Sequence, residues 1–90
     1  MIYKPVYTKR AFSDLAFLGK KDAERVLDKI SYFCSQKDTL RYAKKLKDPK
    51  FGTYRFRIGD YRAIFDLDRG GNVQILLILT IRHRRDIYKF

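Results

Sequence analysis

The sequence predicts an α+β fold of the order β-α-α-β-β-β, with two N-terminal helices packed on one face of a mostly antiparallel four-stranded sheet. Three observations support this prediction. The first half carries an apolar stripe at helical spacing, the pattern changes to a period of two residues after Gly52, and residues 73–81 form the longest apolar run. With 90 residues, of which 46% are hydrophobic, the chain has the length and apolar content of one domain, placed at residues 1–90.

The first half predicts a strand followed by helices. Residues 2–7 alternate weakly, and Pro5 favours an edge position because proline cannot donate a backbone hydrogen bond to a neighbouring strand. Thr8 is expected to cap a short helix that ends at Gly19. Residues 38–50 are ambiguous, and we expect a short helix over residues 40–46 that stops before Pro49. The second helix is predicted from one apolar stripe, formed by Ala23, Val26, Leu27, Ile30, Phe33 and Cys34.

The second half predicts a β-meander. Apolar residues at positions 54, 56 and 58 alternate with Thr53, Arg55 and Arg57, as expected for a strand with one buried face. Gly59 and Asp60 indicate a tight turn, after which residues 61–67 alternate again. A second turn at residues 68–71 leads into residues 73–81. Because that run is apolar on both of its faces, we expect it to be a central strand.

The charge balance indicates a polyanionic partner. Lys and Arg number 21 against 10 acidic residues, which gives a net charge of +11 and a pI of about 10.0. So large a charge on a small body favours nucleic acid first, and an anionic membrane surface or an acidic protein next. The apolar run at 73–81 is far shorter than the roughly 20 residues of a membrane helix, so no membrane span is expected.

The sequence also suggests where the protein resides. Cys34 is the single cysteine, which excludes an internal disulfide and a cysteine-based zinc site and fits a reducing compartment. The first residues carry no apolar signal segment. We therefore expect a cytoplasmic protein.

Four arginines are expected to share one sheet face. Arg55 and Arg57 lie two residues apart on one strand, Arg62 follows the tight turn, and Arg82 ends the long strand. Further along the chain come Arg84, Arg85 and Tyr88. Guanidinium groups that bind phosphate, beside an aromatic ring that stacks on a base, suit RNA. The alternative is a merely solubilising outer face, although adjacent like charges on one sheet face are destabilising.

Other kinds of chemistry lack the residues they need. His83 is the single histidine, which excludes a two-histidine ribonuclease mechanism, and its ordinary role would be that of a partly exposed polar residue. No cluster of carboxylates, histidines and cysteines suggests a metal site, and no glycine-rich loop precedes a helix in the way a phosphate-binding loop would. We expect neither a metal nor another cofactor.

Two segments resemble a known family. The run from Thr53 to Phe65, TYRFRIGDYRAIF, resembles the central hairpin of the RelE/ParE toxin superfamily. The run IRHRRDIYK at residues 81–89 resembles its C-terminal segment, and Ala43 with Leu46 fits a weaker motif that precedes the hairpin. The resemblance implies the RelE-like fold, which has the same strand and helix order. It also implies a toxin of a type II toxin–antitoxin system.

The superfamily has two branches on one scaffold. RelE-like members are ribosome-dependent mRNA endonucleases that cleave codons in the A site, by attack of the 2′-hydroxyl on the adjacent phosphate and without a metal. ParE-like members poison gyrase. The residues that match the family positions favour the nuclease branch, and the resemblance implies a catalytic set of Arg55, Arg57, Arg62, Arg82 and Tyr88. We expect RNA to be bound around this set by Lys44, Lys45, Lys47, Arg84 and Arg85.

One departure from the family affects the chemistry. Several nucleases of the family carry lysine at the positions of Arg55 and Arg57. Because arginine keeps its proton, it is a poor general base, and these two residues are expected to stabilise the charge of the pentavalent phosphorane instead. The 2′-hydroxyl would then be activated by its position, by Tyr88 or by the ribosome.

The resemblance also implies partners. They are the 30S ribosomal A site with its mRNA, and a cognate RelB-like antitoxin with acidic, amphipathic helical segments. Operon DNA would be bound only through the antitoxin. Besides the nuclease and the gyrase inhibitor, a third reading stays open, in which the chain is a non-catalytic RNA-binding or ribosome-binding module.

Overall fold

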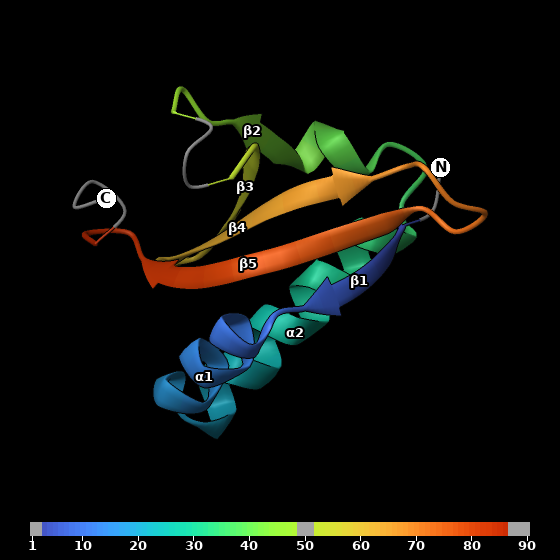
Figure 1. Cartoon of the computed structure of the whole chain (residues 1–90). Coiled ribbons are helices and arrows are strands. Elements are labelled where there is room, and N and C mark those ends of the chain that lie inside the picture. Colours follow the sequence, from blue (N-terminus) through green and yellow to red (C-terminus); the bar gives the residue numbers. More distant parts are fainter. Residues whose placement is uncertain (1–2, 49–51, 87–90) are drawn as a thin grey trace.

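The computed structural model describes residues 3–48 and 52–86 and contains a single mixed sheet with two helices (Figure 1). The elements are β1 (Lys4–Tyr7), α1 (Lys9–Leu18), α2 (Lys20–Ser35), the 3₁₀ helix η1 (Thr39–Tyr42), β2 (Ala43–Lys45), β3 (Tyr54–Ile58), β4 (Tyr61–Asp68) and β5 (Ile75–His83). The sheet order is β1-β5-β4-β3-β2. β1 runs parallel to β5, and the other pairs are antiparallel.

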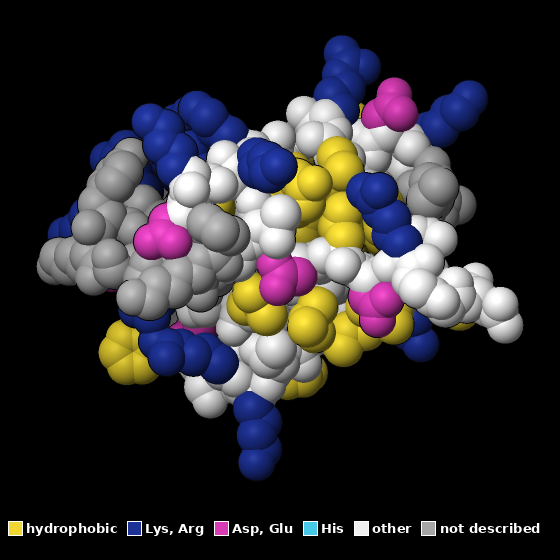
Figure 2. Space-filling model, turned by 45° about the horizontal axis from the view of Figure 1, so that its top comes forward, with side chains coloured by type: hydrophobic (Ala, Val, Ile, Leu, Met, Phe, Trp, Pro, Cys, Tyr) yellow, Lys and Arg dark blue, Asp and Glu magenta, His cyan; other side chains and the backbone are white. Residues whose placement is uncertain are grey.

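The predicted fold class is confirmed. β5 lies inside the sheet as expected for a strand that is apolar on both faces, and β1, which contains Pro5, lies at an edge. α1 and α2 lie together on one side of the sheet (Figure 1). The opposite side, here called the open face, is turned toward the viewer in Figure 2.

The first helix begins and ends where the sequence indicates. The hydroxyl of Thr8 accepts a hydrogen bond of 3.1 Å from the backbone N–H of Ala11, which caps α1. Gly19 has φ of 86° and both ends α1 and precedes α2. Glycine adopts this left-handed conformation without the steric cost that a side chain would add, so α2 can start at once in a new direction.

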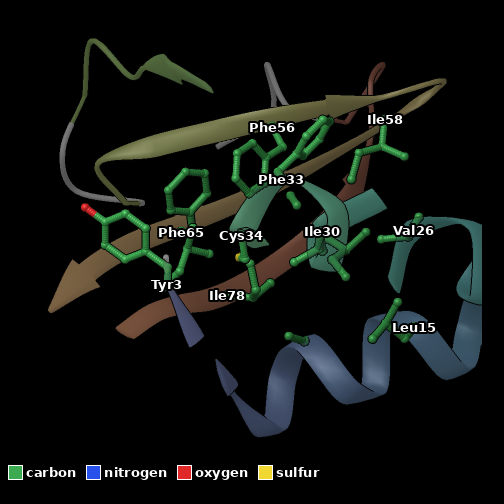
Figure 3. Close-up of a cluster of buried hydrophobic side chains, with 14 residues drawn as sticks. Tyr3, Leu15, Val26, Ile30, Phe33, Cys34, Phe56, Ile58, Phe65 and Ile78 are labelled. Carbon is green, nitrogen blue, oxygen red and sulfur yellow. The ribbon is translucent and has the colours of Figure 1, made fainter. Parts of the chain in front are cut away.

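The core lies between the helices and the sheet (Figure 3). Val26, Ile30, Phe33 and Cys34 of α2 are buried, as the apolar stripe predicted. The Phe33 ring lies 4.7 Å from that of Phe56 on β3. Because Phe56 faces the helices, strand alternation turns its neighbours on β3 toward the open face.

The expected helix over residues 40–46 is wrong, and so is the count of four strands. A single 3₁₀ turn, η1, covers the first residues of this range, and β2 follows as a fifth strand. β2 pairs with β3 in the register Ala43↔Phe56 and Lys44↔Arg55. A strand of 3 residues is too short to show a period of two in the sequence, and it is defined here by its partner β3.

The first helix completes the edge of β5. β1 pairs with β5 only as far as Ile78, so the backbone of β5 beyond that residue lacks a strand neighbour on this side. Asp14 on α1 supplies a hydrogen-bond acceptor there in place of a strand. Its carboxylate accepts from the Ile81 N–H at 2.9 Å and from the Thr80 hydroxyl at 2.6 Å. α1 thereby holds the end of β5 that carries Arg82. No helix in the described part of the chain is long and apolar enough to cross a membrane.

Candidate nucleic-acid interface

Three arginines form a row across the sheet. Arg57 on β3 is directly opposite Arg62 on β4, and Arg62 is directly opposite Arg82 on β5. Side chains of directly opposite residues on antiparallel strands start about 4.5–5.5 Å apart. All three start on the open face, because the flanking Ile58 and Ile81 are core residues. We call Arg57, Arg62 and Arg82 the arginine row.

The members of the row differ in exposure. Arg57 is exposed and Arg82 is half-buried, whereas Arg62 is only 7% exposed. The Nη1 atom of Arg62 donates to the carbonyl oxygens of Gly59 and Tyr61, both at 2.9 Å. Arg62 therefore stabilises the β3–β4 turn through these hydrogen bonds. Because its side chain is buried, it would act on a bound anion mainly through its positive charge and not through direct contact. The sequence pattern gave its place in the row but not this burial.

Arg55 and Lys44 extend the basic surface along β3 and β2. Arg55 is two residues from Arg57 and is paired with Lys44 in the sheet, so all three share the open face. Lys45 is paired with Tyr54, whose ring stacks against Phe65, and it therefore starts on the helix side of the sheet. Of the three lysines expected to bind RNA, only Lys44 thus joins the arginines, while Lys47 is exposed beyond the end of β2.

The middle of the open face is apolar. Figure 2 shows hydrophobic side chains there, with Lys and Arg side chains around them. Ile64 is buried on this face because Gly52 lies over it, and a Cβ on Gly52 would stand 2.5 Å from Ile64 Cγ2 and 3.1 Å from Leu79 Cδ1. The close approach and the φ of 142° both require glycine at position 52. The open face is thus an apolar centre with a basic margin.

The segment after β5 is attached to the β3–β4 turn. The Arg84 N–H donates to the Asp60 carbonyl oxygen at 2.6 Å, and Arg84 Nε lies 3.6 Å from the Asp60 carboxylate. Both side chains are more than half exposed, so the ion pair contributes little to stability. The ion pair and the backbone bond instead keep Arg84 next to the β3–β4 turn, to which Arg62 also binds. Asp60 was not expected to have this role. Arg85 is exposed just beyond, and Tyr88 lies outside the described residues.

His83 lies on the other side of the sheet from the arginine row. It is paired with Tyr61, and the two rings meet edge to face at 5.6 Å. Its Nδ1 accepts from the Arg85 N–H at 3.3 Å. The Tyr61 hydroxyl donates to Asp22 on α2 at 3.0 Å, and this bond to a carboxylate raises the pKa of Tyr61. His83 is half-buried, in agreement with the expectation of a partly exposed polar residue.

The described residues contain no group of three His, Cys, Asp or Glu side chains placed to hold a metal ion together. The acidic side chains near the basic surface have structural partners. Asp66, for example, accepts from the N–H and the hydroxyl of Thr53, both at 2.8 Å, and fixes the start of β3. The described arginines and Lys44 of the open face supply cations that can be directed at an anion.

The chain matches a known toxin family. Residues 6–88 match the family model described as the ParE toxin of the type II toxin–antitoxin system parDE. Because the match spans nearly the whole chain, the chain belongs to this family. It is thus a toxin of a toxin–antitoxin system and a member of the RelE/ParE superfamily, as the resemblance of its hairpin and C-terminal segment indicated.

Solved structures agree with this assignment. The toxin–antitoxin complex RelBE2 from Mycobacterium tuberculosis contains a chain with a TM-score of 0.73 and 26% identity, and the match covers 93% of this chain and 100% of that one. The archaeal RelE–RelB complex from Pyrococcus horikoshii OT3 gives 0.68 and 24%, with coverage of 93% and 97%. The YoeB/ParE toxin from Agrobacterium tumefaciens gives 0.63 and 22%, with coverage of 89% and 97%. The last two likenesses concern the fold alone. No curated protein sequence matches the chain significantly.

Proposed function

We propose that the chain is a ribosome-dependent mRNA endonuclease of the RelE-like branch, acting in the cytoplasm on codons in the 30S A site. The arginine row carries this proposal. Three guanidinium groups in neighbouring register on one sheet face concentrate positive charge at one place, and Arg57 is exposed there. Such a place favours a phosphate, since arginine binds phosphate through paired N–H donors.

The proposed reaction is an internal transfer at one phosphate. The 2′-oxygen forms a bond to phosphorus, the bond from phosphorus to the 5′-oxygen breaks, and the 5′-oxygen takes up a proton as it leaves. The products are a 2′,3′-cyclic phosphate and a free 5′-hydroxyl. Arg57 and Arg82 stabilise the negative charge that grows on the non-bridging oxygens, with Arg62 fixed between them and Arg55 beside them. None of these arginines can accept the 2′-hydroxyl proton, and we assign the role of proton acceptor to Tyr88 or to a group of the ribosome.

We propose an antitoxin as the second partner. The solved neighbours from Mycobacterium tuberculosis and Pyrococcus horikoshii are toxin–antitoxin complexes. The open face supports a partner of the same kind here, because its apolar centre and basic margin are complementary to an amphipathic helix with acidic flanks. Such a helix would cover the arginine row, and the antitoxin would supply the contact to operon DNA.

Primer extension in a purified translation system tests the nuclease proposal. The pure protein is added to ribosomes translating a defined mRNA, and the cut sites are mapped. We expect cuts at translated codons, with 5′-hydroxyl ends, and no cuts in the same mRNA without ribosomes. Intact mRNA in the presence of ribosomes would refute the proposal.

The match to the ParE family model favours one alternative, a gyrase inhibitor without nuclease chemistry. The two candidates differ in a supercoiling assay. A ParE-like toxin would stop purified gyrase from supercoiling relaxed plasmid and would leave translated mRNA intact. The nuclease we propose would leave gyrase fully active at the same protein concentration.

A further inference from the structure

An aromatic surface lies on the helix side of the molecule, away from the arginine row. Tyr32, near the end of α2, is 49% exposed, and Tyr42, at the end of η1, is 39% exposed. Their ring centroids are 6.1 Å apart in an edge-to-face arrangement. Large aromatic side chains gain about 1.5–3 kcal/mol from full burial, so two adjacent exposed rings offer area that a ligand can favourably cover.

The core holds the Tyr42 ring in place. Tyr42 stacks on Phe33 with centroids 4.8 Å apart and ring planes inclined by 19°. Phe33 in turn contacts Phe56 within the core. Because one face of the Tyr42 ring covers Phe33, its exposed area belongs to the other face and to the rim. Tyr42 therefore presents a flat aromatic face that is already rigid before a ligand arrives.

Several cations lie near the pair, although Glu24 and Asp28 also line the groove beside Tyr32. The Lys29 ammonium lies 5.6 Å from the centroid of the Tyr32 ring. Arg41 is exposed next to Tyr42, and its positive charge acts on the Tyr42 hydroxyl, as does the negative charge of Asp38. Lys45 is exposed on the helix side of β2, which begins directly after Tyr42. We call Tyr32, Tyr42, Lys29, Arg41 and Lys45 the tyrosine platform.

The edge strand β2 links this platform to the basic open face. Lys44 starts on the open face beside Arg55, and Lys45 starts on the helix side. β2 is the last strand of the sheet, so the two lysines place positive charge on both sides of one edge. A strand of nucleic acid that runs from the arginine row across β2 toward Tyr42 would pass Lys44 and Lys45.

We propose that the tyrosine platform binds an unpaired RNA nucleotide, with its base stacked on Tyr42 and its phosphates held by Lys45, Arg41 and Lys29. The inference rests on the proposed function only in that the strand crossing β2 is RNA. An acidic protein segment would use the same cations, but it would stack on the exposed ring only where it carries an aromatic side chain, whereas every nucleotide brings a planar base. Base–aromatic stacking of this kind tolerates any base.

Two polyanions separate stacking from charge attraction. We would measure binding of the full chain, without ribosomes, to a fluorescent single-stranded RNA of about ten nucleotides and to inorganic polyphosphate, which has no bases. Tyr42→Leu keeps an apolar contact with Phe33 but removes the ring. We expect it to weaken RNA binding about tenfold and to leave polyphosphate binding unchanged. Tyr42→Phe should bind RNA as the original protein does.

The matched control is Phe17→Leu, which removes an aromatic ring that is 93% exposed on α1. It should change neither affinity. Equal RNA binding by Tyr42→Leu and the original protein would overturn the proposal, and so would an equal loss of RNA and polyphosphate binding, which would show that charge attraction and not stacking had changed. The cleavage assay keeps this test separate from the proposed function. If Tyr42→Leu binds RNA normally and the original protein still cuts translated mRNA, the tyrosine platform is refuted and the proposed nuclease is not.

Discussion

Arg62 has two roles that oppose each other. Its place between Arg57 and Arg82 puts a third positive charge where two already repel, while its bonds to the Gly59 and Tyr61 carbonyl oxygens hold the β3–β4 turn. Hydrogen bonds from a charged donor contribute about 1.5–3 kcal/mol each, whereas like charges on neighbouring strands cost about 0.2–1 kcal/mol. The turn bonds therefore dominate, and Arg62 stabilises the fold as well as the site.

We predict that Arg62→Ala lowers the free energy of unfolding by about 1–3 kcal/mol, measured by urea denaturation. Arg57→Ala is the matched control. It removes an exposed arginine from the same row, relieves repulsion, and should change the stability by no more than about 0.5 kcal/mol. An Arg62→Ala protein as stable as the original would show that the bonds to the turn do not contribute.

Cys34 should be chemically inert in the folded protein. Its side chain is 2% exposed, and burial raises the pKa of the thiol to about 11. Little thiolate is then present at pH 8, and reagents cannot reach the sulfur. We predict that a disulfide reagent labels the native protein only as slowly as it unfolds, and labels it at once in urea. Prompt labelling of the native chain would contradict the burial.

The same shift predicts how stability depends on pH. The thiol pKa is higher in the folded state than its ordinary value of 9.0, so folding favours the protonated form. This contribution is fully present below pH 9 and is lost as the pH rises toward 11. The free energy of unfolding should therefore decrease over this range, and less steeply in Cys34→Ala. An identical slope in both proteins would exclude Cys34 as the cause.

At the scale of the elements, long patterns were predictable from the sequence and short ones were not. The α2 stripe and the β3–β4 alternation run over enough residues to show their periods, and both agree with the structure. β2 has 3 residues, and it is a strand because β3 offers it an edge. Such a partner cannot be read from a local pattern, which is why a helix was expected there.

In the candidate site, too, features set by a local pattern were predictable and features set by long-range packing were not. Alternation placed Arg55, Arg57 and Arg62 on one face correctly, because side-chain direction is set by the strand itself. The burial of Arg62 and the contact between Arg84 and Asp60 depend on how a turn and a chain end pack in three dimensions. Neither has a signature in the sequence. The roles of Tyr88 and of the arginines in catalysis stay predictions.

Asp14 connects α1 to the end of β5, and it should stabilise the fold strongly. Its carboxylate accepts from the Ile81 N–H and from the Thr80 hydroxyl. Replacing Asp14 with alanine leaves the Ile81 N–H without its acceptor, because β1 does not extend far enough to pair with it. An unsatisfied donor of this kind costs about 1–3 kcal/mol. We predict a loss of about 2 kcal/mol for Asp14→Ala in thermal or urea unfolding.

The matched variant is Thr80→Val, which removes only the hydroxyl bond to Asp14 and keeps the backbone bond from Ile81. It should cost less than Asp14→Ala, about 1 kcal/mol. If the two variants were equally stable, the bond to the Ile81 N–H would not be what holds this end of β5.

At the scale of the whole molecule, the net charge of +11 should govern association with RNA. If about four to six phosphates are contacted, the logarithm of the affinity falls against the logarithm of salt concentration with a slope near −3 to −4. A salt titration of binding to single-stranded RNA measures this slope. A flat response would mean that the basic surfaces described here are not where RNA binds.

The high net charge means that every cation adds some attraction for RNA. Long-range attraction is screened within about 8–10 Å at physiological salt, so a lysine on a helix contributes little to a reaction at the arginine row. A site, in contrast, depends on individual groups. Replacing one arginine of the row and one distant lysine therefore distinguishes a site from bulk charge.

The most direct test of the arginine row as a nuclease site is the rate of mRNA cleavage in a purified translation system, comparing the original protein with Arg82→Ala and Lys20→Ala. Lys20 is exposed at the start of α2, on the helix side of the molecule. Loss of one donor directed at the charge of the transition state should slow cleavage about 10²–10³-fold in Arg82→Ala, with an unchanged circular dichroism spectrum. Lys20→Ala should cleave at the original rate. Undiminished cleavage by folded Arg82→Ala, or an equal loss in Lys20→Ala, would contradict the account.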